Sequence, residues 1–144
     1  MWFFFALGAS FFWGLTYVFD ERILKQISVP TSLAIASFAV FIVAGVIAFV
    51  SGSLTKDFIQ IGSSRNLFVL ILIGVSTLLI AELLIGFSIS GENSVLAGLI
   101  EISYPIFIAL FSYLLFHEEV LNLGIIVGGF LIFTGILVVY IFSA

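Results

Sequence analysis

Two glutamates, Glu82 and Glu101, stand inside long apolar segments, whereas most other charged residues lie between such segments. A carboxylate in the hydrocarbon region of a membrane costs about 2.5–3.5 kcal/mol even on insertion scales. An acidic residue at such a position therefore indicates a functional site. The chemistry that it offers there is the binding of a proton or of a cation. Glu82 and Glu101 are the first candidates for the site.

The composition indicates that most of the chain is surrounded by lipid. Of the 144 residues, 63% are hydrophobic and 8% are charged, and the mean hydropathy is +1.42. A water-soluble domain of this size cannot cover so much apolar surface. The first partner of the chain is therefore a lipid bilayer, and we expect a multi-pass protein of the inner or plasma membrane.

Five apolar segments are long enough to cross a bilayer, since a transmembrane helix needs about 20 such residues. Transmembrane β-strands would alternate apolar and polar residues, whereas runs such as Phe38–Val50 are apolar on all faces. The sequence thus predicts an all-α membrane protein with a single domain over residues 1–144. The predicted spans are Trp2–Phe19, Ser32–Val50, Leu67–Ile89, Val95–Phe116 and Leu123–Phe142.

The short connection Ser90–Ser94 predicts that the third and fourth spans form an antiparallel hairpin. At 1.5 Å per residue, Glu82 and Glu101 each lie about 10 Å from this connection, so they should share one depth. Two neighbouring carboxylates cannot both ionise at low cost, so one should hold a proton near neutral pH. Such a pair suits the exchange of a proton for a cation. The alternative is a pair of protonated carboxyls that bond to each other, to Ser103, to Tyr104 or to the backbone.

Small and polar residues follow helical spacing on three spans. For Ala6 and Ser10 we prefer close helix packing as the interpretation. A face that holds a carboxylate and a proline goes beyond packing, and nearby aromatic rings suit a cationic or amphipathic metabolite or drug. The faces are Ala6, Ser10, Gly14 and Tyr17; Leu78, Glu82 and Gly86; and Ser94, Gly98, Glu101, Pro105, Ile108 and Ser112. The predicted substrate- or proton-binding residues are Trp13, Tyr17, Glu82, Glu101, Tyr104 and Ser112.

Three features of the connections predict local structure. Pro30 suits the first turn of a helix. The segment Phe58–Ile61 suits a short amphipathic turn along the membrane interface. His117 precedes Glu118 and Glu119 in the fourth connection, His117–Asn122. Because no second cluster of metal ligands is visible, a helix cap is preferred over a metal site for His117.

Several functions are not expected from this sequence. A formal charge of −4 with only four basic residues argues against nucleic acid as a partner. The absence of cysteine excludes disulfides and thiol catalysis. There is no nucleophilic serine motif, phosphate-binding glycine loop or HExxH pattern. We therefore expect no enzyme activity, no cofactor and no metal.

The loop charges divide evenly between the two sides of the membrane. Lys56 and Arg65 fall on the side of the N-terminus, and Arg22 and Lys25 fall on the other. Lys and Arg in short loops set orientation, so this balance favours neither direction. Two interpretations stay open: orientation by the N-terminal amine or first helix, and dual topology with antiparallel pairing.

The last span carries a motif of helix association. Gly124 and Gly128 form GxxxG, and Gly135 follows seven residues later. In an apolar segment these glycines suit a close contact in a dimer or within the monomer.

These glycines are part of a wider resemblance. The motifs that carry it resemble the EamA repeat of the drug/metabolite transporter superfamily; they are Tyr104-Pro105, Phe116–Glu119, Gly128, Leu131-Ile132, Gly135 and Trp13-Gly14. Typical members of this family carry two repeats of opposite orientation, whereas this chain carries one. The resemblance implies a homodimer, in which antiparallel copies would rebuild ten helices around a site near the midplane. Glu82 and Glu101 are not part of the family pattern, so proton coupling is inferred from the residues alone.

Together these observations predict a small-solute transporter that works by alternating access and is proton-coupled through its carboxylates. Pro105 and nearby Gly98 would permit a bend in the fourth span. Three alternatives stay open: a non-transporting membrane subunit or assembly factor, a lipid-linked metabolite flippase, and an uncoupled metabolite exporter.

Overall fold

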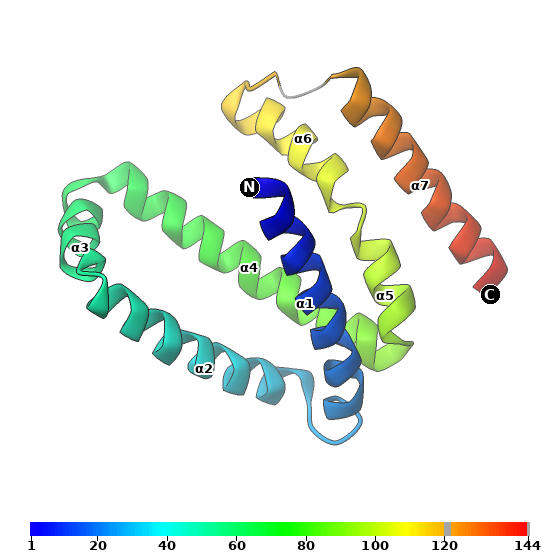
Figure 1. The fold of residues 1–144 in the computed structure, drawn as a ribbon, viewed down its shortest axis with the longest axis horizontal. Coiled ribbons are helices and arrows are strands. Elements are labelled where there is room, and N and C mark those ends of the chain that lie inside the picture. Colours follow the sequence, from blue (N-terminus) through cyan, green and yellow to red (C-terminus); the bar gives the residue numbers. More distant parts are fainter. Residues whose placement is uncertain (120–121, 144) are drawn as a thin grey trace. The chain divides into compact units, whose positions relative to one another are not determined.

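The computed structural model describes residues 1–119 and 122–143. All regular elements in this part of the chain are α-helices, which confirms the predicted fold class (Figure 1). Val120 and Leu121 of the predicted fourth connection, and Ala144 of the predicted domain, lie outside the described residues. The helices are α1 (Trp2–Ile23), α2 (Val29–Val50), α3 (Ser53–Ser63), α4 (Arg65–Gly91), α5 (Ser94–Glu101), α6 (Tyr104–Phe116) and α7 (Leu123–Ser143).

Five segments of these helices are long and apolar enough to cross a membrane, as predicted. They are Trp2–Ile23, Val29–Val50, Arg65–Gly91, Ser94–Phe116 and Leu123–Phe142.

The first helix is longer than its predicted span. It continues through Asp20, Glu21 and Arg22, which the sequence assigned to the connection. The Lys25 Nζ donates to Glu21 Oε1 at 3.2 Å, one helical turn away. Charged side chains at a helix end reach the interface while their stems stay in apolar surroundings, so these charges do not terminate the helix.

The fourth span consists of two helices, where the sequence predicted one bent helix. Ile102 and Ser103 separate α5 from α6, directly after Glu101. Pro105 explains the break, because it has no N–H for the Glu101 carbonyl and its ring would collide with that carbonyl. The Ile106 N–H instead bonds to the Ser103 carbonyl at 3.0 Å. The break therefore puts Glu101 at the end of a helix.

The second connection forms a complete helix, α3, which is longer than the predicted amphipathic turn at Phe58–Ile61. Leu54, Phe58 and Ile61 recur at helical spacing on one face, while Lys56 and Gln60 lie on the other. The preceding Gly52 has a φ of 72°, a left-handed conformation that glycine adopts at little cost. This reversal lets α3 pack against α2.

Two predicted helix ends are confirmed. Pro30 lies in the first turn of α2. His117 is the C-cap of α6, with a φ of 55°. Its N–H bonds to the Tyr113 carbonyl at 3.0 Å, and the Glu118 N–H bonds to the Ser112 carbonyl at 3.2 Å. These bonds satisfy carbonyls that the end of a helix would otherwise leave without a donor.

The chain divides into two compact units, Met1–Asp20 with Gly91–Ala144, and Glu21–Ser90. In the first unit, α5 contacts α7. In the second unit, α2 and α4 approach closely at Val29 and Gly86, where an added Cβ on Gly86 would lie 2.6 Å from Val29 Cγ1. The single domain over residues 1–144 stays a prediction.

Candidate functional site

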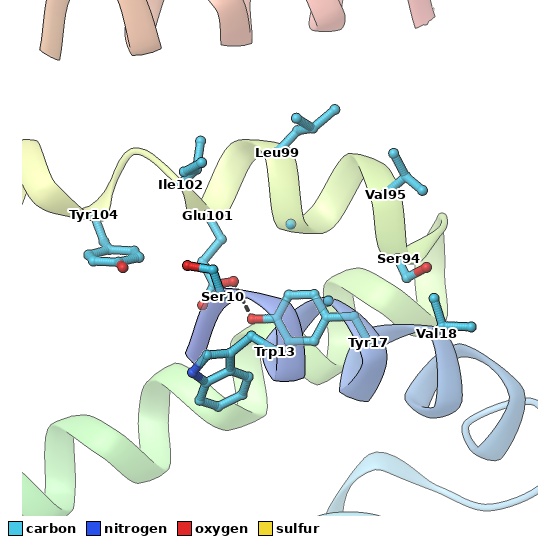
Figure 2. Close-up of a pocket in the computed structure, with 12 residues that line it drawn as sticks. Ser10, Trp13, Tyr17, Val18, Ser94, Val95, Leu99, Glu101, Ile102 and Tyr104 are labelled. Carbon is cyan, nitrogen blue, oxygen red and sulfur yellow. Dashed lines mark hydrogen bonds between the residues drawn. The ribbon is translucent and has the colours of Figure 1, made fainter. Parts of the chain in front are cut away.

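The first unit contains a pocket of about 540 Å³ between α1, α5 and the start of α6 (Figure 2). Small-molecule sites commonly have volumes of about 300–1,000 Å³, so this pocket is large enough for a small solute. Four of the predicted binding residues line it: Trp13, Tyr17, Glu101 and Tyr104. The other lining residues are Ser10, Gly14, Val18, Ser94, Val95, Gly98, Leu99 and Ile102.

Glu101 supplies the carboxylate of this pocket. The side chain is half-buried, and the Tyr17 hydroxyl donates a hydrogen bond to its Oε2, drawn as a dashed line in Figure 2. Tyr17 belongs to α1 and Glu101 ends α5, so this bond joins two helices that are far apart in the sequence.

Gly98 makes the approach of Tyr17 to α5 possible. An added Cβ on Gly98 would lie 3.3 Å from the Cδ2 atom of the Tyr17 ring. Only a residue without a side chain therefore leaves the ring in its present place. Gly98 and Glu101 are three residues apart on α5, so they share one helix face. The glycine admits the ring, and the carboxylate accepts the hydroxyl of the same side chain.

Aromatic rings surround the carboxylate. The rings of Trp13 and Tyr17 meet edge to face, with centroids 5.8 Å apart and planes inclined at 66°. Trp13 remains 50% exposed and Tyr104 remains 56% exposed. Figure 2 shows Trp13, Tyr17 and Tyr104 on the side of α5 to which Glu101 points. Ring faces carry partial negative charge, so rings and a carboxylate together favour a cation.

Ser10 and Gly14 are among the eight lining residues that were not predicted to bind. For Ser10 the sequence favoured close packing, and its hydroxyl does donate to the Ala6 carbonyl at 3.1 Å. Ser10 and Gly14 nevertheless line the pocket together with Tyr17. Their helical spacing with Tyr17 was the available signal, because it places all three on one face of α1.

Two predicted binding residues do not line this pocket. Glu82 is half-buried on α4, in the second unit. Its pairing with Glu101 stays a prediction, because the two residues belong to different units. Ser112 is half-buried near the C-terminal end of α6. Its carbonyl takes part in ending that helix, by accepting from the Glu118 N–H.

Two of the three glycines of the predicted association motif, Gly128 and Gly135, have open surroundings in the described part of the chain. An added Cβ on Gly128 or Gly135 meets no atom within 4 Å, and on Gly124 it meets Asn122 Oδ1 at 3.2 Å. An added Cβ on the neighbouring Gly129 would lie 3.4 Å from Ile106 Cγ1 of α6, an ordinary van der Waals contact. The glycine of α7 that borders α6 is therefore one that the motif did not include. Association of two copies through Gly128 stays a prediction.

The model of the EamA-like transporter family matches residues 1–141. Comparison with curated proteins and with solved structures finds no match. The family match covers four candidate spans and all but the last residue of the fifth, and these spans fit a single five-helix repeat. The family consists of membrane transporters of the drug/metabolite superfamily. Because the match extends over almost the whole sequence, the chain belongs to the EamA-like transporter family.

Proposed function

We propose that the protein moves a small solute through the pocket of the first unit, with Glu101 as the group that binds a proton or the solute. The observation that carries this proposal is the convergence of one carboxylate and three aromatic side chains in a pocket of about 540 Å³. Membership of a transporter family supports the same activity.

The depth of Glu101 supports proton coupling. The span Ser94–Phe116 begins seven residues before Glu101, which corresponds to about 10 Å along a helix. A carboxylate at this depth is stable when a proton or another cation neutralises it. A proton and a cationic group on the solute therefore compete for the same oxygens, and this competition can couple their movements.

The break after Glu101 supports alternating access. Ile102 and Ser103 interrupt the span, so α5 and α6 can change their mutual angle without breaking a continuous helix. Such a change would alter the surroundings of Glu101 at the break. One repeat is half of the ten-helix architecture, so we further propose that a second copy inserts in the opposite orientation to complete it.

The hydrogen bond between Tyr17 and Glu101 also favours a second candidate function. The bond links α1 to α5. Such a link is expected of a membrane subunit or assembly factor whose carboxylate only stabilises the packing of its helices. The two functions differ in what the charge does. Transport needs a carboxylate that can change its partner, whereas a lock needs only a hydrogen-bond acceptor, which glutamine also supplies.

Flux in proteoliposomes tests the proposal. Purified protein is exposed to a panel of small cations, anions, zwitterions and neutral amphiphiles under an imposed pH gradient, and mass spectrometry measures their accumulation. We expect the wild type to accumulate at least one solute that empty liposomes exclude. Glu101→Gln should abolish the part of the accumulation that the pH gradient drives. Glu92→Gln is the control and should leave it unchanged, because Glu92 is an exposed carboxylate before α5.

The outcomes separate the two functions. Absence of flux for every solute, with folded protein in the vesicles, would favour the non-transporting subunit. Undiminished gradient-driven flux in Glu101→Gln would remove Glu101 from the coupling mechanism. Glu82→Gln tests the predicted carboxylate pair in the same assay, because a coupled pair requires both residues.

A further inference from the structure

We infer that the pocket of the first unit selects a substituted ammonium ion with a compact apolar or aromatic body, and that this ligand displaces the Tyr17 hydroxyl from Glu101. This inference rests on the proposed function only in placing the ligand in the same pocket. The binding of the ligand is measured at equilibrium, so the inference can fail or succeed independently of transport.

The charge of the lining determines the sign of the ligand. Among the described residues that line the pocket, Glu101 is the only acidic side chain and none is basic. An anion would meet the carboxylate without a positive partner, which costs free energy in surroundings of low dielectric. A zwitterion would leave its own carboxylate without a partner. A ligand with a single positive charge is the one that the lining neutralises.

The character of the lining distinguishes an organic cation from a metal ion. Hard metal cations require about six or more oxygen ligands, and the described residues contain no group of three His, Cys, Asp or Glu side chains that could hold one. The pocket instead offers one carboxylate next to Trp13, Tyr17 and Tyr104. Aromatic faces attract substituted ammonium ions, which are weakly hydrated and carry apolar groups.

The Glu101 carboxylate has a hydrogen-bond partner that such a ligand must replace. Tyr17 donates to Glu101 Oε2, so the phenol occupies part of the carboxylate to which the ammonium group would bind. The ring of Tyr17 also packs edge to face on Trp13, and it can contact the ligand through its face. Tyr17 thus has two opposed effects. Its hydroxyl competes with the cation for the Glu101 carboxylate, whereas its ring attracts the cation. Tyr17→Phe separates them, because it removes the hydroxyl and keeps the ring.

A proton is the other competitor for Glu101. The other titratable side chains that line the pocket in the described chain are Tyr17 from α1 and Tyr104 from α6. Protonation of Glu101 removes the negative charge, so cation affinity should fall as the pH is lowered. Replacement by glutamine should remove this dependence.

The experiment compares two probes of similar size and opposite charge, phenyltrimethylammonium and benzenesulfonate. Equilibrium dialysis against protein in neutral detergent measures their binding, with empty micelles as the blank. We expect the wild type to bind the ammonium at least about tenfold more tightly than the sulfonate, and Glu101→Gln to lose this preference. Glu92→Gln should behave as the wild type. Tyr17→Phe should bind the ammonium severalfold more tightly.

Equal affinity of the wild type for the two probes would overturn the inference, as would unchanged ammonium binding in Glu101→Gln. Weaker ammonium binding in Tyr17→Phe would overturn the displacement step. If Glu101→Gln does not fold, Trp13→Leu serves in its place, because Trp13 is 50% exposed, and severalfold weaker ammonium binding is then required. Binding without flux would contradict only transport, and flux of anions without ammonium binding would contradict only the ligand class.

Discussion

Among single residues, Glu101 can present its carboxylate to the pocket because three nearby residues each contribute a different local feature. Pro105 ends the helix directly after it, Gly98 makes room for a ring, and Tyr17 donates a hydrogen bond to it. A carboxylate without such neighbours would be an unpartnered polar group in an apolar span, which is costly. Glu101 therefore depends on groups from α1, α5 and α6.

His117 is a second residue whose conformation has a measurable consequence. Its φ of 55° places a residue with a Cβ in the left-handed region. His117→Gly should raise the free energy of unfolding by about 1 kcal/mol, because glycine adopts this conformation without the steric cost. Thermal unfolding in detergent measures the change. His117→Ala is the control and should not stabilise, since it keeps the Cβ. A less stable glycine variant would indicate that the imidazole itself makes a contribution.

At the scale of the element, helices approach each other where glycine leaves room. Gly86 on α4 admits Val29 of α2, and Gly98 on α5 admits Tyr17 of α1. Lipid provides no hydrophobic drive between helices, so association depends on such close packing and on polar bonds.

The contact between α2 and α4 offers a direct test of this packing. Gly86→Ala should lower the free energy of unfolding by about 1–3 kcal/mol, because the new Cβ would lie near 2.6 Å from the buried, β-branched Val29. Thermal unfolding in detergent again gives the measurement. Gly74→Ala on the same helix is the matched control, since a Cβ there meets no atom within 4 Å. Equal stability of the two variants would show that α2 and α4 can separate at no cost.

At the scale of the whole molecule, the chain carries one five-helix repeat. Glycines of α7 that have open surroundings within the described chain are available to a second copy. In the proposed antiparallel homodimer these glycines would form the contact between the two copies. The even distribution of loop charges would allow the copies to insert in opposite orientations. Two predictions examine these points separately.

Gly128→Leu should prevent association of two copies while leaving the fold of one copy intact. The reason is that a Cβ at Gly128 meets no atom within 4 Å in the described chain, whereas a leucine would block close approach of another backbone. Crosslinking in bilayers reports the dimer. Gly45→Leu on α2, also with open surroundings, is the control. Unchanged crosslinking of Gly128→Leu would exclude this face of α7 from the interface.

Reporters fused to the C-terminus should detect the protein on both sides of the membrane. Lys56 and Arg65 oppose Arg22 and Lys25, so the loop charges favour neither orientation. Addition of two lysines to residues 91–93 should shift the population towards one side. A single orientation in both proteins would contradict dual topology, and a partner of opposite orientation would then be needed to complete ten helices.

The sequence alone was sufficient to predict the five spans, the helix start at Pro30 and the cap at His117. These features depend on the apolar length of a segment and on the φ, ψ preferences of single residues. Both are local properties of the chain, so the sequence alone determines them. It also predicted four residues of the pocket, because a carboxylate and aromatic rings are conspicuous in an apolar helix. Its family resemblance was confirmed over residues 1–141.

Only the tertiary structure decided which of these residues meet. The bond between Tyr17 and Glu101 joins positions 84 residues apart, and no local pattern encodes such a distance. The rotation and axial position of each helix select its contacts, and small changes in either would bring different residues together. For this reason Gly98 makes the close contact with Tyr17, and Ser10 lines the pocket. Spacing within one helix defines its faces, whereas packing between helices decides which face borders the pocket.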